Sequence, residues 1–157
     1  MVGVFVNPEL DEVDKAVEDA GLTMVQLNGQ EGQSFCAEVA RRTGVKVIKA
    51  IHVASAADVH NAEAFRTDFH LFDRKGKGLW GGTGESFDWG LLAGHRSEVP
   101  AIVAGGLRPD NVGEAIALTH PHAVDVASGV EVEPGRKDHA LMEAFFEAAK
   151  AASVPAP

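Results

Sequence analysis

Short apolar runs rich in β-branched residues recur along the whole chain at intervals of about 20 to 30 residues. The runs are VGVFVN from Val2, TMVQLN from Thr23, VKVIKAIHV from Val45, FHLFD from Phe69, PAIVAGG from Pro100 and AVDVASG from Ala123. Each run is typical of a β-strand. The segments between them carry helical signals, so the sequence predicts six consecutive strand–helix units.

The predicted helices are clearest near the N-terminus. Asn7 is a candidate N-cap, Pro8 suits the first turn, and Gly21 is expected to end this helix. A second helix is expected after Glu31 and should end at Gly44. Further helical patterns cover residues 56–65, 88–94, 109–119 and 137–151.

Strands that alternate with helices predict parallel strands joined by right-handed crossovers. Near-continuous apolar runs favour a sheet that helices cover on at least one face. An open doubly wound sheet and a segment of a (βα)8 barrel both fit six units. A chain of 157 residues is long enough for one domain with a sizeable core. We therefore expect a single α/β domain over residues 1–157.

Charge and composition exclude several classes of function. The net charge of −9, without any cluster of Lys and Arg, argues against nucleic acid as a partner. The segment MVGVFVNPEL lacks the features of a targeting signal, and no apolar run is long enough to span a membrane. We expect a cytoplasmic protein. The single cysteine, Cys36, suits a reducing compartment and is interpreted as a core residue because it lies on the apolar side of its helix.

In a parallel sheet, functional groups gather at the carboxyl ends of the strands. Polar or glycine residues follow each predicted strand, namely Asn7, Asn28, His52, Asp73, Gly105 with Gly106, and Ser128 with Gly129.

Two glycine-bearing loops, AGGLRPDNV and ASGVEVEPG, are candidates for holding a phosphate group. Outward-pointing backbone N–H groups of glycine-rich turns bind phosphate well, and the loops after the last two strands of a barrel often do so. The second loop has room for a short extra helix. The alternative is that Gly105 and Gly106 only permit a tight turn and Ser128 only caps a helix.

Asp73 ends an otherwise apolar strand, which is typical of a general acid or base at the rim of a site. A helix-capping or loop-anchoring role is the alternative. Asp125 is expected inside the last strand, as a buried supporting acid rather than a catalytic one.

The glycine-rich segment GKGLWGGTG after Asp73 matches neither the P-loop nor the dinucleotide-binding pattern. Glycines permit the large backbone changes of loop closure, so we interpret this segment as a lid. The seven histidines lack the H-E-x-x-H spacing, and no metal site is expected.

These motifs together resemble the phosphoribosylanthranilate isomerase family of tryptophan biosynthesis, from Val2 to about Lys150. The segments that carry the resemblance are VGVFVN, VQLNG followed by Glu31, VIKAI, LFD with GGTGESFDW, AGGLRPDNV and VDVASGVEVEPGRKDH. The resemblance implies a (βα)8 TIM barrel. It also implies an Amadori rearrangement of N-(5'-phosphoribosyl)anthranilate, without a cofactor.

The resemblance also implies roles for individual residues. Asp73 matches the family's general acid. Four residues match positions that hold the substrate phosphate, namely Gly105, Gly106, Ser128 and Gly129. Three further residues fall in the family's active-site loop, namely Gly81, Gly82 and Gly84.

The chain departs from the family pattern at its start. The family's barrel opens with a Lys-Ile-Cys-Gly strand whose Cys is the general base, and a second unit supplies an arginine near the anthranilate. Neither unit matches here, so the resemblance implies an incomplete barrel with strands three to eight and little or no activity alone. Many members have His where this chain has Asn28. The open sheet edges predict either self-association or a loosened monomer. The alternative function is a non-catalytic assembly module, completed by a separate N-terminal piece or a second copy.

Overall fold

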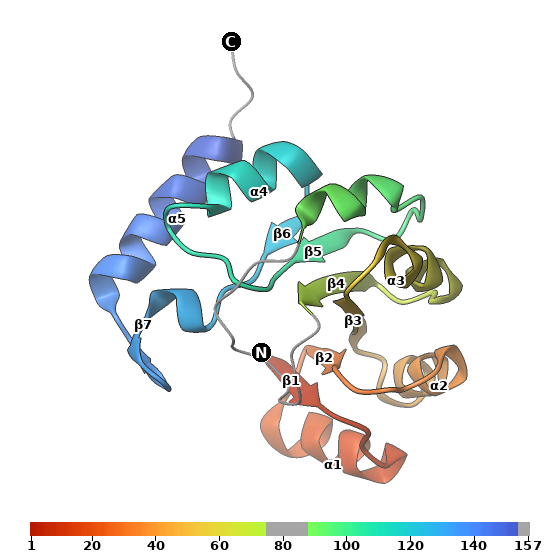
Figure 1. Cartoon of the computed structure of the whole chain (residues 1–157). Helices are drawn as coiled ribbons and strands as arrows, with labels where there is room; N and C mark the ends of the chain where they lie inside the picture. The colour runs from red at the N-terminus through yellow and green to blue at the C-terminus, as the bar shows by residue number, and fades with distance from the viewer. Residues whose placement is uncertain (75–87, 154–157) are drawn as a thin grey trace.

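The structure, a computed structural model, describes residues 1–74 and 88–153 and contains a parallel sheet with helices packed on one face (Figure 1). The strands lie in chain order, each parallel to the next: β1 (Val2–Phe5), β2 (Met24–Leu27), β3 (Lys46–Val53), β4 (Phe69–Arg74), β5 (Ala101–Val103) and β6 (Ala123–Val124). The six predicted strands and their parallel order are confirmed.

The helices follow the predicted pattern closely. They are α1 (Leu10–Ala20), α2 (Gln33–Thr43), α3 (Ala56–Asn61) with the 3-10 turn η1 (Ala62–Ala64), η2 (Trp89–Gly94), α4 (Val112–Thr119) and α5 (His139–Ser153). The short helix expected after the last strand is η3 (Ser128–Val130). An antiparallel hairpin of β7 (Glu131–Glu133) and β8 (Arg136–Lys137) follows η3, and the sequence did not predict it.

The ends of the first two helices test the sequence rules. Gly21 and Gly44 both adopt the left-handed conformation, at φ 59° and 68°, and end α1 and α2 as predicted. The prediction that Asn7 caps α1 is wrong, because the N-cap is Glu9. Asn7 has φ 49°, and its Oδ1 accepts a hydrogen bond from the Gln30 backbone at 2.7 Å. Its side chain therefore joins two loops instead of starting a helix.

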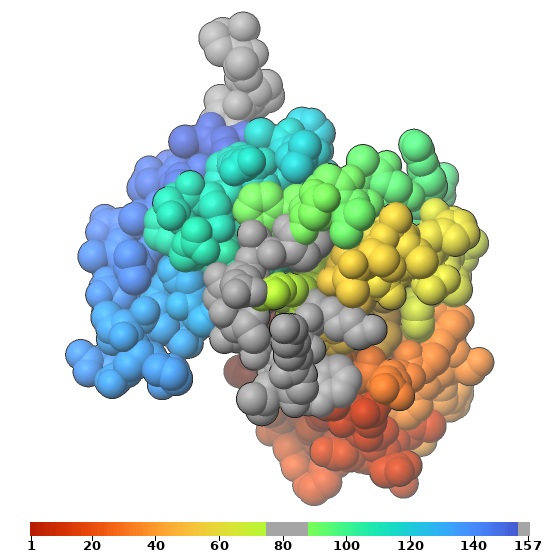
Figure 2. Space-filling view, in the orientation of Figure 1, coloured from red at the N-terminus to blue at the C-terminus, as the bar shows by residue number. Residues whose placement is uncertain are grey.

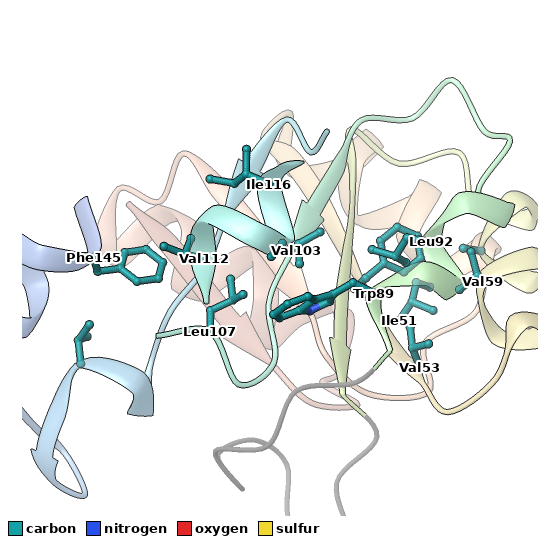
Figure 3. Close-up of a cluster of buried hydrophobic side chains, with 14 residues drawn as sticks. Ile51, Val53, Val59, Trp89, Leu92, Val103, Leu107, Val112, Ile116 and Phe145 are labelled. Carbon is teal, nitrogen blue, oxygen red and sulfur yellow. The ribbon is translucent and has the colours of Figure 1, made fainter. Parts of the chain in front are cut away.

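The two faces of the sheet bury different clusters. The outer face, which we define as the face toward the helices, contributes Ile51, Val53 and Val103 to a large cluster with Trp89 and helix residues (Figure 3). The opposite, inner face contributes a smaller cluster of Ile48, Ala50, Leu71 and Ala104. Side chains alternate along each strand, so the residue positions that point toward the inner face follow directly from these contacts.

The inner face is less covered at β1. Among the described strands β1 pairs only with β2, and Phe5 packs on the outer side. Val2, Val4 and Val6 alternate with it on the inner side and are 45%, 60% and 42% exposed. Figure 2 shows the units arranged in an arc, with the N-terminal unit in red at one end and the C-terminal hairpin region in blue at the other.

A pair of histidines links β4 to the segment after η2. His70 is fully buried, and its Nε2 lies 3.1 Å from the Phe65 carbonyl oxygen. Because a carbonyl can only accept, Nε2 carries the proton, and Nδ1 accepts from His95 Nε2 at 3.1 Å. Burial lowers the pKa of His70, and charge on His95 and Arg66 lowers it further. Burial also lowers the pKa of His95, against the opposing effect of Glu63.

This pair predicts a specific loss of stability in mild acid. The pKa of both histidines is lower in the folded state, so the unfolded chain binds protons first as the pH falls below about 6.5, and folding is disfavoured there. The variant His95→Gln keeps a donor toward His70 but cannot titrate. We expect it to lose less stability than wild type between pH 7.5 and 5.5, by on the order of 1 kcal/mol, as measured by urea unfolding.

The matched control is His139→Gln, which replaces an exposed histidine at the first residue of α5. It should lose as much stability as wild type over the same pH range. Equal losses in wild type and His95→Gln would contradict the prediction.

Candidate functional site at the carboxyl ends of the strands

Asp73 lies at the carboxyl end of β4 on the inner face, next to the buried outer-face residue Phe72. Its side chain is half-buried, and Oδ1 accepts a hydrogen bond from the Arg74 backbone at 2.7 Å. Burial raises the pKa of Asp73, against smaller lowering effects of that hydrogen bond and of charge on His52. A carboxyl group in this state retains its proton more readily than an exposed one, as a general acid requires.

The loop between β5 and α4 packs directly against Asp73. Gly105 and Gly106 have φ of 79° and 69°. A Cβ atom on Gly105 would lie 2.7 Å from the Arg74 backbone nitrogen and 2.8 Å from Asp73 Oδ1. Asn111 fixes the loop, since its Nδ2 donates to the Gly106 carbonyl at 3.0 Å. Glycine is thus required at position 105 by both its conformation and its closeness to the acid.

The loop after β6 contacts the loop after β5. Ser128 and Gly129 form η3, and a Cβ atom on Gly129 would lie 1.8 Å from the Leu107 carbonyl oxygen. No side chain fits there, so the two backbones meet at this point. The structure therefore brings the two predicted glycine loops together and sets one of them beside Asp73.

Asp125 differs from its prediction in two respects. It follows β6 instead of lying inside it, although its backbone still donates to the Val103 carbonyl at 2.9 Å. It is also exposed at the rim, not buried, because the loop carries it beyond the paired strand. Protein atoms around the carboxylate still reduce its hydration and raise the pKa of Asp125, and the charge of Asp73 adds to this.

The first three strands carry a buried ion pair that the sequence reasoning missed. Lys49 on β3 is 3% exposed and Glu31 is 7% exposed, and Lys49 Nζ donates to Glu31 Oε2 at 2.7 Å. Burial would raise the pKa of Glu31, but hydrogen bonds from Lys49 and the Asn7 backbone lower it below its ordinary value. The available signal was a lysine within the apolar run VIKAI.

Other predicted residues lie away from this end of the sheet or outside the described ranges. Cys36 is buried in α2, and burial raises the pKa of its thiol to about 11, which confirms the core interpretation. Gly81, Gly82 and Gly84 lie outside the described residues. Within residues 1–74 and 88–153, no group of three His, Cys, Asp or Glu residues could hold a metal ion. No helix in the same ranges is long and apolar enough to cross a bilayer.

Fold and site together define a parallel α/β protein whose acid and glycine loops meet at one end of the sheet. Residues 1–148 match the family model of N-(5'-phosphoribosyl)anthranilate (PRA) isomerase. The chain is 47% identical over 156 residues to the N-(5'-phosphoribosyl)anthranilate isomerase of Caulobacter vibrioides and 46% identical to that of Ruegeria sp.. The chain belongs to the phosphoribosylanthranilate isomerase family.

Solved structures of the same family agree in fold. The phosphoribosyl anthranilate isomerase of Thermotoga maritima matches with a TM-score of 0.83 and 37% identity, over 96% of this chain and 72% of that one. A phosphoribosyl anthranilate isomerase in complex with reduced 1-(o-carboxyphenylamino)-1-deoxyribulose 5-phosphate matches with a TM-score of 0.80 and 36% identity. The chain spans 71% of the length of the Caulobacter relative and 73% of the Ruegeria relative.

Proposed function

We propose that this chain carries the general acid and the phosphate-binding loops of a phosphoribosylanthranilate isomerase, which acts in tryptophan biosynthesis. The observation that carries the proposal is the contact between the Gly105 loop and Asp73, where a Cβ atom would lie 2.8 Å from the carboxylate. A ligand phosphate on that loop would place the attached ribose beside the acid. Family membership supports the same reaction.

In the proposed reaction Asp73 is the catalytic acid. Its carboxyl proton goes to the furanose ring oxygen as the C1–O bond breaks, and the anthranilate nitrogen forms the C1=N bond of a Schiff base. A base then removes the C2 proton to give an enolamine. No metal or cofactor takes part. Asp125 is proposed as a supporting acid beside Asp73, whose negative charge raises the pKa of Asp125.

The phosphate of a phosphoribosyl ligand is proposed to bind the backbone of Gly105, Gly106, Ser128 and Gly129. Amide groups of two touching glycine loops can converge on one dianion, and the absence of side chains on the three glycines lets the ligand approach closely. Gly81, Gly82 and Gly84 are proposed as the active-site loop. The protein is proposed to act in the cytoplasm.

The six strands are proposed to correspond to strands three to eight of the family's eight-stranded barrel, in one domain over residues 1–157. The 71% share of the Caulobacter relative fits this correspondence. The Lys-Ile-Cys-Gly segment expected to supply the base does not occur in these 157 residues. Cys36 is no substitute, because it is buried on the helix side of the sheet with a thiol pKa of about 11.

This assignment predicts little or no turnover by the 157 residues alone. Loss of a general base commonly costs about two to four powers of ten in rate. We expect kcat/KM to be at least about a hundredfold below that of a full-length relative. Adding a separately made segment with the Lys-Ile-Cys-Gly strand should raise it, and Asp73→Asn should abolish the gain. Turnover by the chain alone within about tenfold of the relative would contradict the prediction.

Phosphate binding is predicted to persist where turnover does not. In a titration with reduced 1-(o-carboxyphenylamino)-1-deoxyribulose 5-phosphate, the amide signals of Gly106 and Gly129 should shift, as followed by NMR. The same compound without its phosphate is the control and should leave them in place. Unmoved signals at both glycines would remove the phosphate-binding assignment.

The exposed inner face of β1 favours the second candidate function, a non-catalytic assembly module. Among the described strands β1 pairs with β2 alone, and such an edge strand with three exposed valines on one face of its segment is a template for association with another copy of the chain. The net charge of −9 opposes this contact at low salt, so association should strengthen as salt screens it.

Association is testable by sedimentation at several concentrations. We expect a dimer that forms with increasing concentration in 0.5 M salt and is lost in Val4→Lys, which places a charge on the exposed face. Val132→Lys is the matched control, since Val132 is 52% exposed on the hairpin, away from β1. A concentration-independent monomer in wild type would leave β1 without this role.

A further inference from the structure

His52 lies at the carboxyl end of β3 on the inner face. It alternates with Ile51 and Val53, which pack in the outer cluster, and follows Ile48 and Ala50, which pack in the inner one. The imidazole is half-buried at the rim of the site. None of the roles assigned above accounts for a titratable ring at this position.

The ring is held by the end of the neighbouring strand. The β2–β3 register ends at the pair Leu27 and Lys49. Asn28 is the next residue after Leu27, and its carbonyl oxygen lies 2.9 Å from His52 Nε2. A carbonyl oxygen only accepts, so Nε2 carries the proton of this bond. The Asn28 backbone also donates to the Phe5 carbonyl at 2.8 Å. A line of hydrogen bonds thus runs from β1 through Asn28 to His52 and fixes the ring.

On its other side His52 is in direct register with Asp73. The two residues are partners in the parallel β3–β4 ladder, where neighbouring strands lie about 4.8 Å apart. Side chains of registered neighbours point to the same face, so the imidazole and the carboxyl group stand side by side. His52 is therefore the residue between the anchored end of β2 and the proposed acid.

Several charged groups surround this pair. Glu31, Lys49 and Asp58 line the same cavity of about 270 Å3 as His52. Glu31 and Lys49 neutralise each other in their buried ion pair. Asp58 accepts hydrogen bonds at the start of α3, and Asp125, which follows β6, is affected by the charge of Asp73. Arg74 follows Asp73 directly on β4, and His52 is the registered neighbour on β3 whose charge acts on Asp73.

We propose that His52 is a positioning residue for Asp73, which holds the end of β2 against the site and supplies the local charge that governs whether Asp73 carries its proton. The inference rests on the proposed function of Asp73 as the acid. Without charge on the imidazole, burial favours the protonated carboxyl group, which can donate. A protonated imidazole favours the carboxylate, which cannot donate to the ring oxygen. The direction of the His52 effect on the pKa of Asp73, which is to lower it against the dominant effect of burial, agrees with this role.

The test is a titration of the Asp73 carboxyl carbon by NMR in the free chain, with aspartate labelled by carbon-13. In His52→Gln the amide still donates to the Asn28 carbonyl, but the charge is gone. We expect the midpoint of Asp73 to rise by about 1 pH unit. In His52→Lys the charge is permanent, and the midpoint should lie at or below the wild-type value. His60→Gln, at an exposed histidine, should leave it unchanged.

An Asp73 midpoint in His52→Gln equal to that of wild type would overturn the inference. If His52→Gln does not fold, His52→Lys still decides, because a midpoint above wild type there would also overturn it. The titration uses no substrate, so its result is independent of turnover. Full activity of the completed enzyme with Asp73→Asn would contradict the proposed function. The effect of His52 on Asp73 is tested separately, by the titration.

Discussion

The buried pair of Lys49 and Glu31 fixes the geometry of the first three strand ends. Lys49 Nζ donates to the Leu27 carbonyl at 3.3 Å, to the Gly29 carbonyl at 2.8 Å and to Glu31. Glu31 accepts in turn from the backbone of Asn7 and Gly29. All three ammonium protons have acceptors, which a buried cation requires. Removing one partner of such a pair commonly costs about 3–5 kcal/mol, because the other charge stays buried without compensation.

The Lys49–Glu31 pair helps to fix the positions of His52 and Asp73. Lys49 and His52 lie on opposite faces of β3, and both bind the backbone that follows β2, Lys49 at Leu27 and Gly29 and His52 at Asn28. β3 and β4 are paired from Ile48–Phe69 to Val53–Arg74, and this pairing fixes Asp73 relative to His52. Beyond β4, the glycine loops are anchored by the outer-face apolar cluster that contains Trp89 and Leu107.

The sequence predicted those parts of the fold that depend on local chemistry. Strands and the glycine ends of α1 and α2 follow from side-chain pattern and from the left-handed conformation that glycine allows. Asn7 and Lys49 escaped prediction because their partners, Gln30 and Glu31, lie 23 and 18 residues away and only the fold brings them together. The hairpin of β7 and β8 was missed because its strands are too short to give an alternating pattern.

In the candidate site too, the sequence predicted the local features and missed those that depend on the fold. Asp73 and the glycine loops could be found from strand ends and from a family resemblance, since each is a short segment with its own signature. His52 was visible only as one residue after a strand, and its relation to Asp73 depends on the register of β3 and β4. The predicted position of Asp125 was wrong for a related reason, because the segment VDVAS does not reveal that β6 is only two residues long.

The arrangement separates binding from chemistry within one chain. The proposed phosphate recognition by backbone amides needs only the two glycine loops, which meet where Gly129 approaches the Leu107 carbonyl. Proton transfer in the proposed isomerisation needs two groups, an acid at the ring oxygen and a base at C2, and Asp73 is the candidate for the acid. If a base at C2 is lacking, as proposed, the transition state is affected far more than the bound ligand, so kcat should fall and affinity for a phosphoribosyl compound should not.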